Sequence, residues 1–424
     1  MRKMKDSGIE WIGEIPEDWK IQRAKFLFRQ RSEKGNKNPV LLSPTQKNGV
    51  VPQSELEGVV KLKEETDLQS LRTVHSGDYI ISLRSFQGGF ELSNLEGVCS
   101  PAYQVFFPIA DNISHQFFKY LFKSETFIEK INNLTTGIRE GKNILYADFA
   151  NILLPVPYLS EQVAIANFLD EKCAVIDRLV ERHQEVIEKL KAYRQSVISE
   201  AVTRGLDPDA PMKDSGIPWI GKIPEDWKID KIKYISKFNP GCSRHFDRHE
   251  SVGYLPMECL KHGYMTPLKT EYEKITSALT CFEDGDIVLA KVTPCFENGN
   301  IAIAHNLENH TGFVSSELFV FRCSGYETRF LFYIFQNSNF MNECISTMTG
   351  TGGLKRVSSD FIRNCRIPVP DLQSQQQIAD YLDEKCAKID RIIQEKEQII
   401  VKLTEYKKSI IYEYVTGKKE VPAS

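Results

Sequence analysis

Three short segments in each half of the chain carry side chains that could bind the base edges or phosphates of a nucleic acid. The first is a polar loop ending in glycine, the second a turn after an apolar run, and the third a run of basic residues beside glycines. Such side chains supply donors and acceptors for base edges, and backbone amides near glycine can approach phosphate. In the first half the candidates are Gln46, Lys47, Asn48, Arg84, Ser85, Gln87, Arg139, Lys142 and Asn143. In the second half they are Lys261, His262, Lys291, Thr293, Lys355 and Arg356.

Each segment also has an ordinary structural interpretation. The first segment could equally be a solvated hairpin, and both interpretations stay open. In the second segment, Arg84 could bind guanine and Gln87 adenine through paired hydrogen bonds, whereas Lys291 could equally contact a phosphate. For the second and third segments we favour nucleic-acid contact over plain solvent exposure. A further basic cluster, for which exposed surface charge is the default explanation, comprises Arg244, His245 and Arg248.

The chain carries no recognisable catalytic motif. The run 137–142 has the wrong spacing for a phosphate loop, and neither a dinucleotide fingerprint, a nucleophile elbow nor a zinc-protease motif occurs. The Asn/Asp-Pro-Pro-aromatic tetrapeptide of amino-methyltransferases is also absent. The ten cysteines are scattered without Cys-x-x-Cys pairs, which predicts reduced thiols and no structural metal. We therefore expect a non-enzyme that holds neither a cofactor nor a metal.

Length and composition indicate two globular domains. At 424 residues the chain exceeds one ordinary core. The formal net charge of −3 argues against simple nucleic-acid binding through overall charge, although a local patch could still be basic. No apolar stretch approaches the roughly 20 residues of a membrane span, and the polar start is unlike a signal peptide. We expect a cytoplasmic protein.

The strongest organisational feature is an internal repeat. Residues 4–21 return almost unchanged as 212–229, and residues 155–174 return as 368–387, whereas the intervening stretches agree only in outline. We call the repeated blocks the frame and the stretches between them the inserts. A chain that repeats its frame and varies its inserts would present two different recognition domains on one symmetric support.

Hydrophobic periodicity predicts the elements that would position the candidate residues. Short apolar runs at 77–83, 102–107, 285–290 and 318–321 predict strands. One-sided apolar spacing predicts a helix over 116–134 and another over 327–348. A longer helix follows in each copy, with a seam of three- and four-residue steps and one polar residue, His183 or Lys396, at the same seam position. The obvious partner for each seam is the other long helix. The tryptophans of the extended leads, and Cys173 and Cys386 in the seams, are expected to be core residues.

These repeated blocks resemble the specificity subunit of Type I restriction–modification systems. The residues that carry the resemblance, together with their second-copy equivalents, are Ile9, Trp11, Ile12, Gly13, Pro16, Trp19, Gly285, Asp286, Pro155, Pro157, Gln162, Ile165, Ala166, Leu169, Asp170, Ile176 and Asp177. The first copy departs from the common pattern, because Tyr79-Ile80-Ile81 follows Gly77-Asp78.

The resemblance implies an α+β fold with two pseudo-two-fold-related α/β target-recognition domains, separated by two long antiparallel helices that form a coiled coil. It implies double-stranded DNA as the ligand, with a bipartite asymmetric target. The implied partners are two modification subunits, which carry S-adenosylmethionine and methylate adenine, and two ATP-driven restriction subunits. The family's specificity subunit holds no catalytic residues.

On this basis the expected domains are 1–155 and 206–368 for target recognition, with spacer helices in 156–205 and 369–424. A helical scaffold that joins two protein partners without binding nucleic acid is the alternative from another class. A standalone methyltransferase or nuclease would require this chain to bind a cofactor by itself.

Overall fold

The computed structural model describes residues 2–35, 40–45, 49–56, 68–81, 89–134, 144–242, 244–276, 279–351 and 353–422. Two compact units divide the chain. The first contains 1–183 and 398–424, and the second contains 184–397. Each unit therefore contains half of each long helix. We call the rest of the unit its head. The finer boundaries at 155, 205 and 368 stay predictions.

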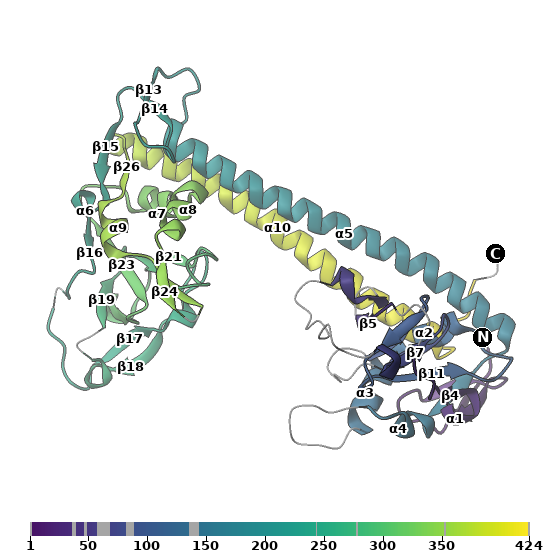
Figure 1. Ribbon diagram of the computed structural model, residues 1–424. Coiled ribbons are helices and arrows are strands. Elements are labelled where there is room, and N and C mark those ends of the chain that lie inside the picture. The colour runs from purple at the N-terminus through teal and green to yellow at the C-terminus, as the bar shows by residue number, and fades with distance from the viewer. Residues whose placement is uncertain are drawn as a thin grey trace. The chain divides into compact units, whose positions relative to one another are not determined.

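Two long helices, α5 (Leu159–Arg204) and α10 (Leu372–Val415), pack together and run in opposite directions (Figure 1). In the first unit, Nζ of Lys407 on α10 lies 2.7 Å from Oδ1 of Asp177 on α5. In the second unit, Nε of Arg194 on α5 lies 3.1 Å from Oδ1 of Asp390 on α10. Asp177 and Asp390 are equivalent in the repeat, as are Arg194 and Lys407. The same ion pair is thus made twice, each time between the two copies, and the predicted antiparallel pairing is confirmed.

The first head is built around a four-stranded antiparallel sheet, ordered β4 (Phe28–Gln30), β11 (Gln104–Pro108), β8 (Tyr79–Ile81), β9 (Phe90–Leu92). Two-stranded pairs flank this sheet: β1 (Met4–Asp6) with β2 (Glu14–Pro16), β3 (Lys20–Arg23) with β12 (Leu153–Val156), β5 (Leu42–Thr45) with β6 (Gly49–Pro52), and β7 (Arg72–Val74) with β10 (Gly97–Cys99). The helices are α1 (Ala24–Leu27), α2 (His115–Lys123), α3 (Glu125–Leu134) and α4 (Tyr146–Ala150).

The second head repeats this sheet as β16 (Ser236–Phe238), β23 (Leu318–Cys323), β20 (Ile287–Ala290), β21 (Ile301–Ile303). A second, mixed sheet follows the order β18 (Leu268–Glu271), β17 (Ser251–Leu255), β22 (Thr311–Val314), β19 (Thr280–Glu283). The remaining strand pairs are β13 (Met212–Asp214) with β14 (Lys222–Pro224), β15 (Lys228–Lys231) with β26 (Arg366–Val369), and β24 (Thr349–Thr351) with β25 (Leu354–Arg356). The helices are α6 (Ile232–Ile235), α7 (Thr328–Gln336), α8 (Ser338–Ser346) and α9 (Ser359–Asn364).

The predicted strands are confirmed as β8, β11, β20 and β23, but the two predicted mid-head helices are wrong in one respect. Each is two helices, because the backbone is extended at Ser124 between α2 and α3 and at Asn337 between α7 and α8. The Asn337 side chain accepts from the amides of Asn339 and Phe340, and so caps a new helix. A polar capping residue inside an apolar periodic run was the missed signal.

The repeated blocks fasten each head to its long helix. In the first unit, buried Gln162 on α5 accepts from the amide of Ser114 (2.8 Å) and donates to the carbonyls of Asn112 and Pro157 (2.9 Å each). Ser114 caps α2, and Tyr120 on the same helix donates to Asp170 (2.6 Å). These bonds join a head helix to the helix pair, so the position of the head's sheet depends on residues of the frame.

The second unit repeats the same junction. Gln375 on α10 accepts from the amide of Glu327 (2.8 Å) and donates to the carbonyl of Pro370 (2.8 Å). Tyr333 donates to Asp383 (2.6 Å), as Tyr120 does to Asp170. The two different heads are therefore joined to the long helices by equivalent hydrogen bonds.

Three of the four lead tryptophans, Trp19, Trp219 and Trp227, are buried core residues as predicted, and Trp11 is partly buried against the core. Trp19 and Trp227 are buried, and Nε1 of Trp19 donates to Oε2 of Glu161 (3.0 Å). Each packs beneath the end of a long helix, where Gly205 and Gly417 adopt φ of 77° and 72°. A Cβ at Gly417 would lie 2.4 Å from Cδ of Pro16, so only glycine fits there.

One expectation about cysteine is wrong. Cys242 and Cys281 form a disulfide across 39 residues, with a Cα–Cα distance of 5.4 Å, whereas the other eight cysteines are free. No motif indicates this pairing, because the two residues lie on segments that only the fold of the second head brings together. Among the described residues, no helix is long and apolar enough to cross a membrane.

Candidate nucleic-acid interface

The three segments of the second head, predicted separately from the sequence, converge on one surface around the loop 291–300. The third segment forms the hairpin β24–β25, and its Arg356 bridges to Val292 of the second segment. Thr293 joins these two segments further, because its amide donates to the carbonyl of Lys355 (2.9 Å) and its hydroxyl donates to the carbonyl of Gly353 (2.8 Å). The amide of Lys355 in turn donates to the hydroxyl of Thr293 (2.9 Å).

The first segment reaches the other side of the same loop. His262 bridges to Ile301, its Nδ1 lies 3.0 Å from the carbonyl oxygen of Gly299, and the amide of Gly263 donates to the carbonyl of Ile301 (2.8 Å). The loop between the second segment and Ile301 is held compact by amides at Phe296 and Asn298, which donate to the carbonyls of Val292 and Pro294 (2.9 Å each). All six predicted residues of this head therefore belong to one connected group of loops.

The side chains in this group differ in how free they are to meet a ligand. Lys261 and Lys355 are exposed, and within the described ranges neither ammonium group forms an ion pair. Arg356 is also exposed, but its guanidinium makes two hydrogen bonds of 2.9 Å to Glu317. This ion pair lowers the pKa of Glu317. The hydroxyl of Thr293 is already bonded, so this residue positions the hairpin.

His262 is suited to act as a neutral ring. Desolvation lowers the pKa of His262, and the positive charge of Arg194 on α5 lowers it further. Both effects favour the uncharged form of the ring. It can exchange hydrogen bonds with a base edge, but it adds no positive charge for a phosphate.

The nine predicted residues of the first head lie outside the described residues. Their flanking strands are described for the first segment, where β5 and β6 form an antiparallel pair with Thr45 opposite Gly49. The hydroxyl of Thr45 donates to the carbonyl of Gly49 (2.9 Å). All of these residues remain predictions.

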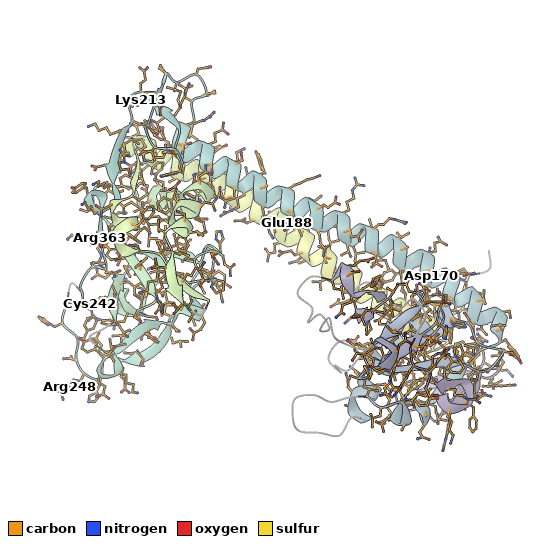
Figure 2. The ribbon with its side chains drawn as sticks, in the orientation of Figure 1. Asp170, Glu188, Lys213, Cys242, Arg248 and Arg363 are labelled. Atoms are coloured by element: carbon orange, nitrogen blue, oxygen red, sulfur yellow. A yellow bond between two sulfur atoms is a disulfide. The ribbon has the colours of Figure 1, made fainter. Side chains whose placement is uncertain are left out.

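The additional basic cluster lies on the stretch 239–250 of the second head. Figure 2 shows Arg248 at the end of this head that is remote from Lys213, with Cys242 close to the same end. The guanidinium of Arg244 lies 4.4 Å from the ring centroid of Phe246 and forms an ion pair with Glu250. Arg248 and His245 are exposed. The contacts of Arg244 with Phe246 and Glu250 thus hold part of this basic cluster in a defined position.

A buried carboxylate in each sheet was missed as a supporting residue. Asp78 accepts two 2.7 Å hydrogen bonds from Arg31, and Asp286 accepts two 2.8 Å hydrogen bonds from Arg322. The strand registers show that the two arginines are not equivalent, because Arg31 follows β4 and Arg322 lies on β23. Where the second head has Arg322, the first has Phe107, whose ring centroid lies 4.4 Å from the Arg31 guanidinium.

A second compensated exchange distinguishes the heads. In the first head, buried Glu91 on β9 lies 2.8 Å from Nζ of Lys123, the last residue of α2. The strand registers place Ala302 at the position of Glu91, and Gln336 ends α7 where Lys123 ends α2. The two positions therefore differ together: both are charged in the first head and both are uncharged in the second. The inserts therefore differ down to their cores while keeping one sheet order.

The described residues bring together one group that could hold a metal ion, His249 with Glu271 and Glu273. Lys274 lies 3.4 Å from Glu271, and the His249 ring lies 3.8 Å from Glu273. The Lys274–Glu271 ion pair and the surface contact of His249 with Glu273 account for the group without a metal.

Large apolar side chains recur at equivalent exposed positions of the two long helices. Beside the Asp177–Lys407 ion pair of the first unit, Leu179 and Tyr406 are 42% and 59% exposed. Beside the Arg194–Asp390 ion pair of the second unit, their equivalents Ile392 and Tyr193 are 41% and 54% exposed. We call each of these pairs a helix patch.

Comparison with known proteins identifies a family for this architecture. The model of the Type I restriction modification DNA specificity domain matches twice, at 9–190 and at 224–403. The MjaVIII specificity subunit of Methanocaldococcus jannaschii is 25% identical over 96% of this chain and 94% of its own length. The EcoAI specificity subunit of Escherichia coli is 28% identical over 46% of this chain, a match that spans 33% of that protein.

Solved structures agree on the fold. A chain solved in work on complex assembly and conformational transition of the type I R-M system has a TM-score of 0.69 at 15% identity, covering 96% of this chain and 99% of that one. The HsdS subunit from Thermoanaerobacter tengcongensis has a TM-score of 0.50 at 16% identity, covering 96% and 98%.

Proposed function

This chain belongs to the Type I restriction–modification DNA specificity family, and we propose that it reads a bipartite, asymmetric sequence in double-stranded DNA. One head would bind each half-site. The observation that carries this proposal is the convergence of three separately predicted segments on the loop 291–300 of the second head. A surface of several short loops can present lysines to phosphates and neutral donors to base edges at the same time.

The asymmetry of the target follows from the inserts. The mountings through Gln162 and Gln375 are the same in both units, whereas buried pairs such as Glu91–Lys123 occur in one head only. Heads with different interiors present different loops, so the two half-sites are expected to differ in sequence.

We also propose that the helix patches bind modification subunits, one per unit. An exposed leucine or tyrosine alone needs no explanation. Here the same apolar pair recurs beside the same ion pair in both units, on the repeated frame. Two copies of one partner, one bound to each unit, would account for this recurrence. Two restriction subunits complete the proposed complex, in which this chain is the non-catalytic, cytoplasmic subunit and binds no cofactor or metal of its own.

Binding measurements on the complex of this chain with its modification subunit test the DNA proposal. We expect a selected pool of duplexes to share two unlike half-sites at a fixed gap, and the affinity to fall steeply as salt rises. Selection of no common sequence would refute the proposal. Affinity for a protein partner alone, unchanged by salt, would favour the helical-scaffold alternative.

The helix patches are tested by the stoichiometry of the complex. The double variant Leu179→Ser/Tyr406→Ser alters the patch of the first unit, and we expect native mass spectrometry to show one modification subunit fewer. The control is Val401→Ser, which alters an exposed valine on α10 whose equivalent, Glu188, is not apolar. An unchanged stoichiometry in the double variant would contradict this role.

A further inference from the structure

The Cys242–Cys281 disulfide fixes a stretch of the second head that has few other anchors. Cys281 is buried on β19, and Cys242 is half-buried, four residues after β16 ends at Phe238. Within the described part of 239–250 there is no helix and no strand. The disulfide therefore holds this stretch in place, as strand pairing holds other parts of the head.

At its start the stretch is held by Asn239, whose amide donates to the carbonyl of Val320 (2.8 Å) and whose side chain accepts from the Val320 amide (3.0 Å). Beyond Cys242, the apolar contacts gather around one aromatic side chain. Phe246 stacks on Tyr272, with ring centroids 4.7 Å apart, and meets the edge of Phe313 at 5.4 Å. Two backbone hydrogen bonds of 2.9 Å reach the carbonyls of Arg248 and Glu250 from the segment after β18. With the disulfide intact, Arg244 and Arg248 are presented from a cross-linked loop.

The two sulfur atoms differ in their exposure to solvent, and this difference determines which of them a small thiol would attack. Cys242 is the more exposed, so the thiolate of a small thiol would attack its Sγ, and Cys281 would leave as a thiolate and take up a proton. A second small thiol would then attack the mixed disulfide and release Cys242. In total two small thiols are oxidised to one small disulfide, and the protein disulfide is reduced to two thiols. The reverse sequence reforms it.

The first head has no such pair. Its free cysteine, Cys99, is buried, and burial raises the pKa of its thiol to about 12. Cys259, Cys295 and Cys323, in the second head, are half-buried and free. A change in redox conditions would therefore act on one head and leave the other unchanged.

We propose that Cys242 and Cys281 form a thiol–disulfide site that exchanges with small thiols and disulfides, and that its state controls how rigidly the second head holds Arg244 and Arg248. The consequence for DNA rests on the proposed function. Reduction would weaken recognition of the half-site bound by the second head, whereas recognition of the other half-site would stay the same.

The first test needs no DNA. The full chain is equilibrated in mixtures of reduced and oxidised glutathione, quenched with acid, unfolded and titrated for thiols, while parallel samples are digested briefly with trypsin. We expect eight thiols in oxidising mixtures and ten in reducing ones. We also expect cleavage after Arg244 and Arg248 to be roughly tenfold faster in the reduced protein, because the loop opens more often. Ten thiols in every mixture, or equal cleavage rates in both states, would overturn the proposal.

Two variants sharpen the result. Cys242→Ser/Cys281→Ser should be cleaved at the rate of the reduced protein in every mixture. The control Cys323→Ser removes a free, half-buried thiol outside the loop 291–300, and it should be cleaved at the rates of the unaltered chain with one thiol fewer in each mixture. If the double variant does not fold, the unaltered chain still decides the question. A separate measurement of DNA binding in both states tests the link to recognition: equal affinity in both states would refute that link, whereas absence of DNA binding in either state would count against the proposed function and not against the site.

Discussion

Exchanging the buried pair of the first head for that of the second gives the most quantitative test of how the heads diverged. The side chain of Glu91 is 4% exposed and that of Lys123 is 29% exposed. Burial raises the pKa of Glu91, whereas the charge and hydrogen bond of Lys123 act in the opposite direction and favour its ionised form. Removing one partner of a buried ion pair costs about 3–5 kcal/mol when the other stays charged and enclosed.

The two single variants should therefore be unequal. Lys123→Gln leaves the buried carboxylate alone, and we expect a loss of about 3 kcal/mol, at the lower end because Glu91 lines a cavity of about 420 Å³ that admits water. Glu91→Ala removes the poorly solvated charge, and Lys123 can turn into this cavity, so the loss should be about 1 kcal/mol. The double variant reproduces the Ala302 and Gln336 of the second head and should cost about 1 kcal/mol or less.

Hydrogen exchange at the amides of β8 and β9 is the appropriate assay, because it reports the first head alone. A loss of about 3 kcal/mol accelerates exchange through opening roughly 150-fold. Lys119→Gln is the matched control, since Lys119 pairs with half-exposed Asp170 at 3.5 Å and its loss should cost less than about 1 kcal/mol. The reasoning fails if Glu91→Ala is the more damaging single variant, or if the double variant costs the sum of both.

This pair also predicts a dependence on pH. Because the folded state raises the pKa of Glu91 above its value in the unfolded chain, the folded head takes up a proton first as pH falls. The penalty of Lys123→Gln should shrink as pH falls from neutral through that raised pKa, and opening rates corrected for intrinsic exchange would show it. A penalty that grows on acidification would contradict the direction of the shift.

Four further outcomes are expected. Gln162→Ala should destabilise the first unit by about 3 kcal/mol, measured by thermal unfolding, because it strips buried hydrogen bonds from two carbonyls and one amide at the start of α2. NMR titration should place the pKa of His262 below 6.5, so protonation opposes folding as pH falls through 6.5; a value above 6.5 would contradict its desolvated position. Lys355→Ala should reduce the slope of log affinity against log salt by about 1, whereas Glu317→Gln, which frees Arg356, should tighten DNA binding; no change in either would remove the hairpin from the interface.

The frame of this protein could be predicted because its signals are local and repeated. The seam of each long helix, the glycine–proline punctuation of the leads and the apolar runs of β8 and β20 each depend on neighbours within a few residues. The family resemblance supplied the antiparallel direction of the helices. The ion pairs at Asp177 and Asp390 then show that each copy's aspartate pairs with the other copy's basic residue.

What the sequence could not give were the pairings that depend on the fold. The Cys242–Cys281 bond joins residues with no common motif, and the arginine for each buried aspartate comes from a different strand in each head. The extended backbone at Ser124 and Asn337 was hidden by apolar spacing that continued across it. Chemical type alone does not indicate which candidate residues lie together. Only the folded loop 291–300 shows that those of the second head share one surface.

Mapping methylated bases across the genome of a cell that carries this protein with its modification subunit tests the central claim most directly. The account predicts modification at a single motif of two unlike half-sites with a constant gap, and loss of specificity at one half when the loops of the second head are replaced. A palindromic motif, a variable gap or methylation without any shared sequence would contradict it.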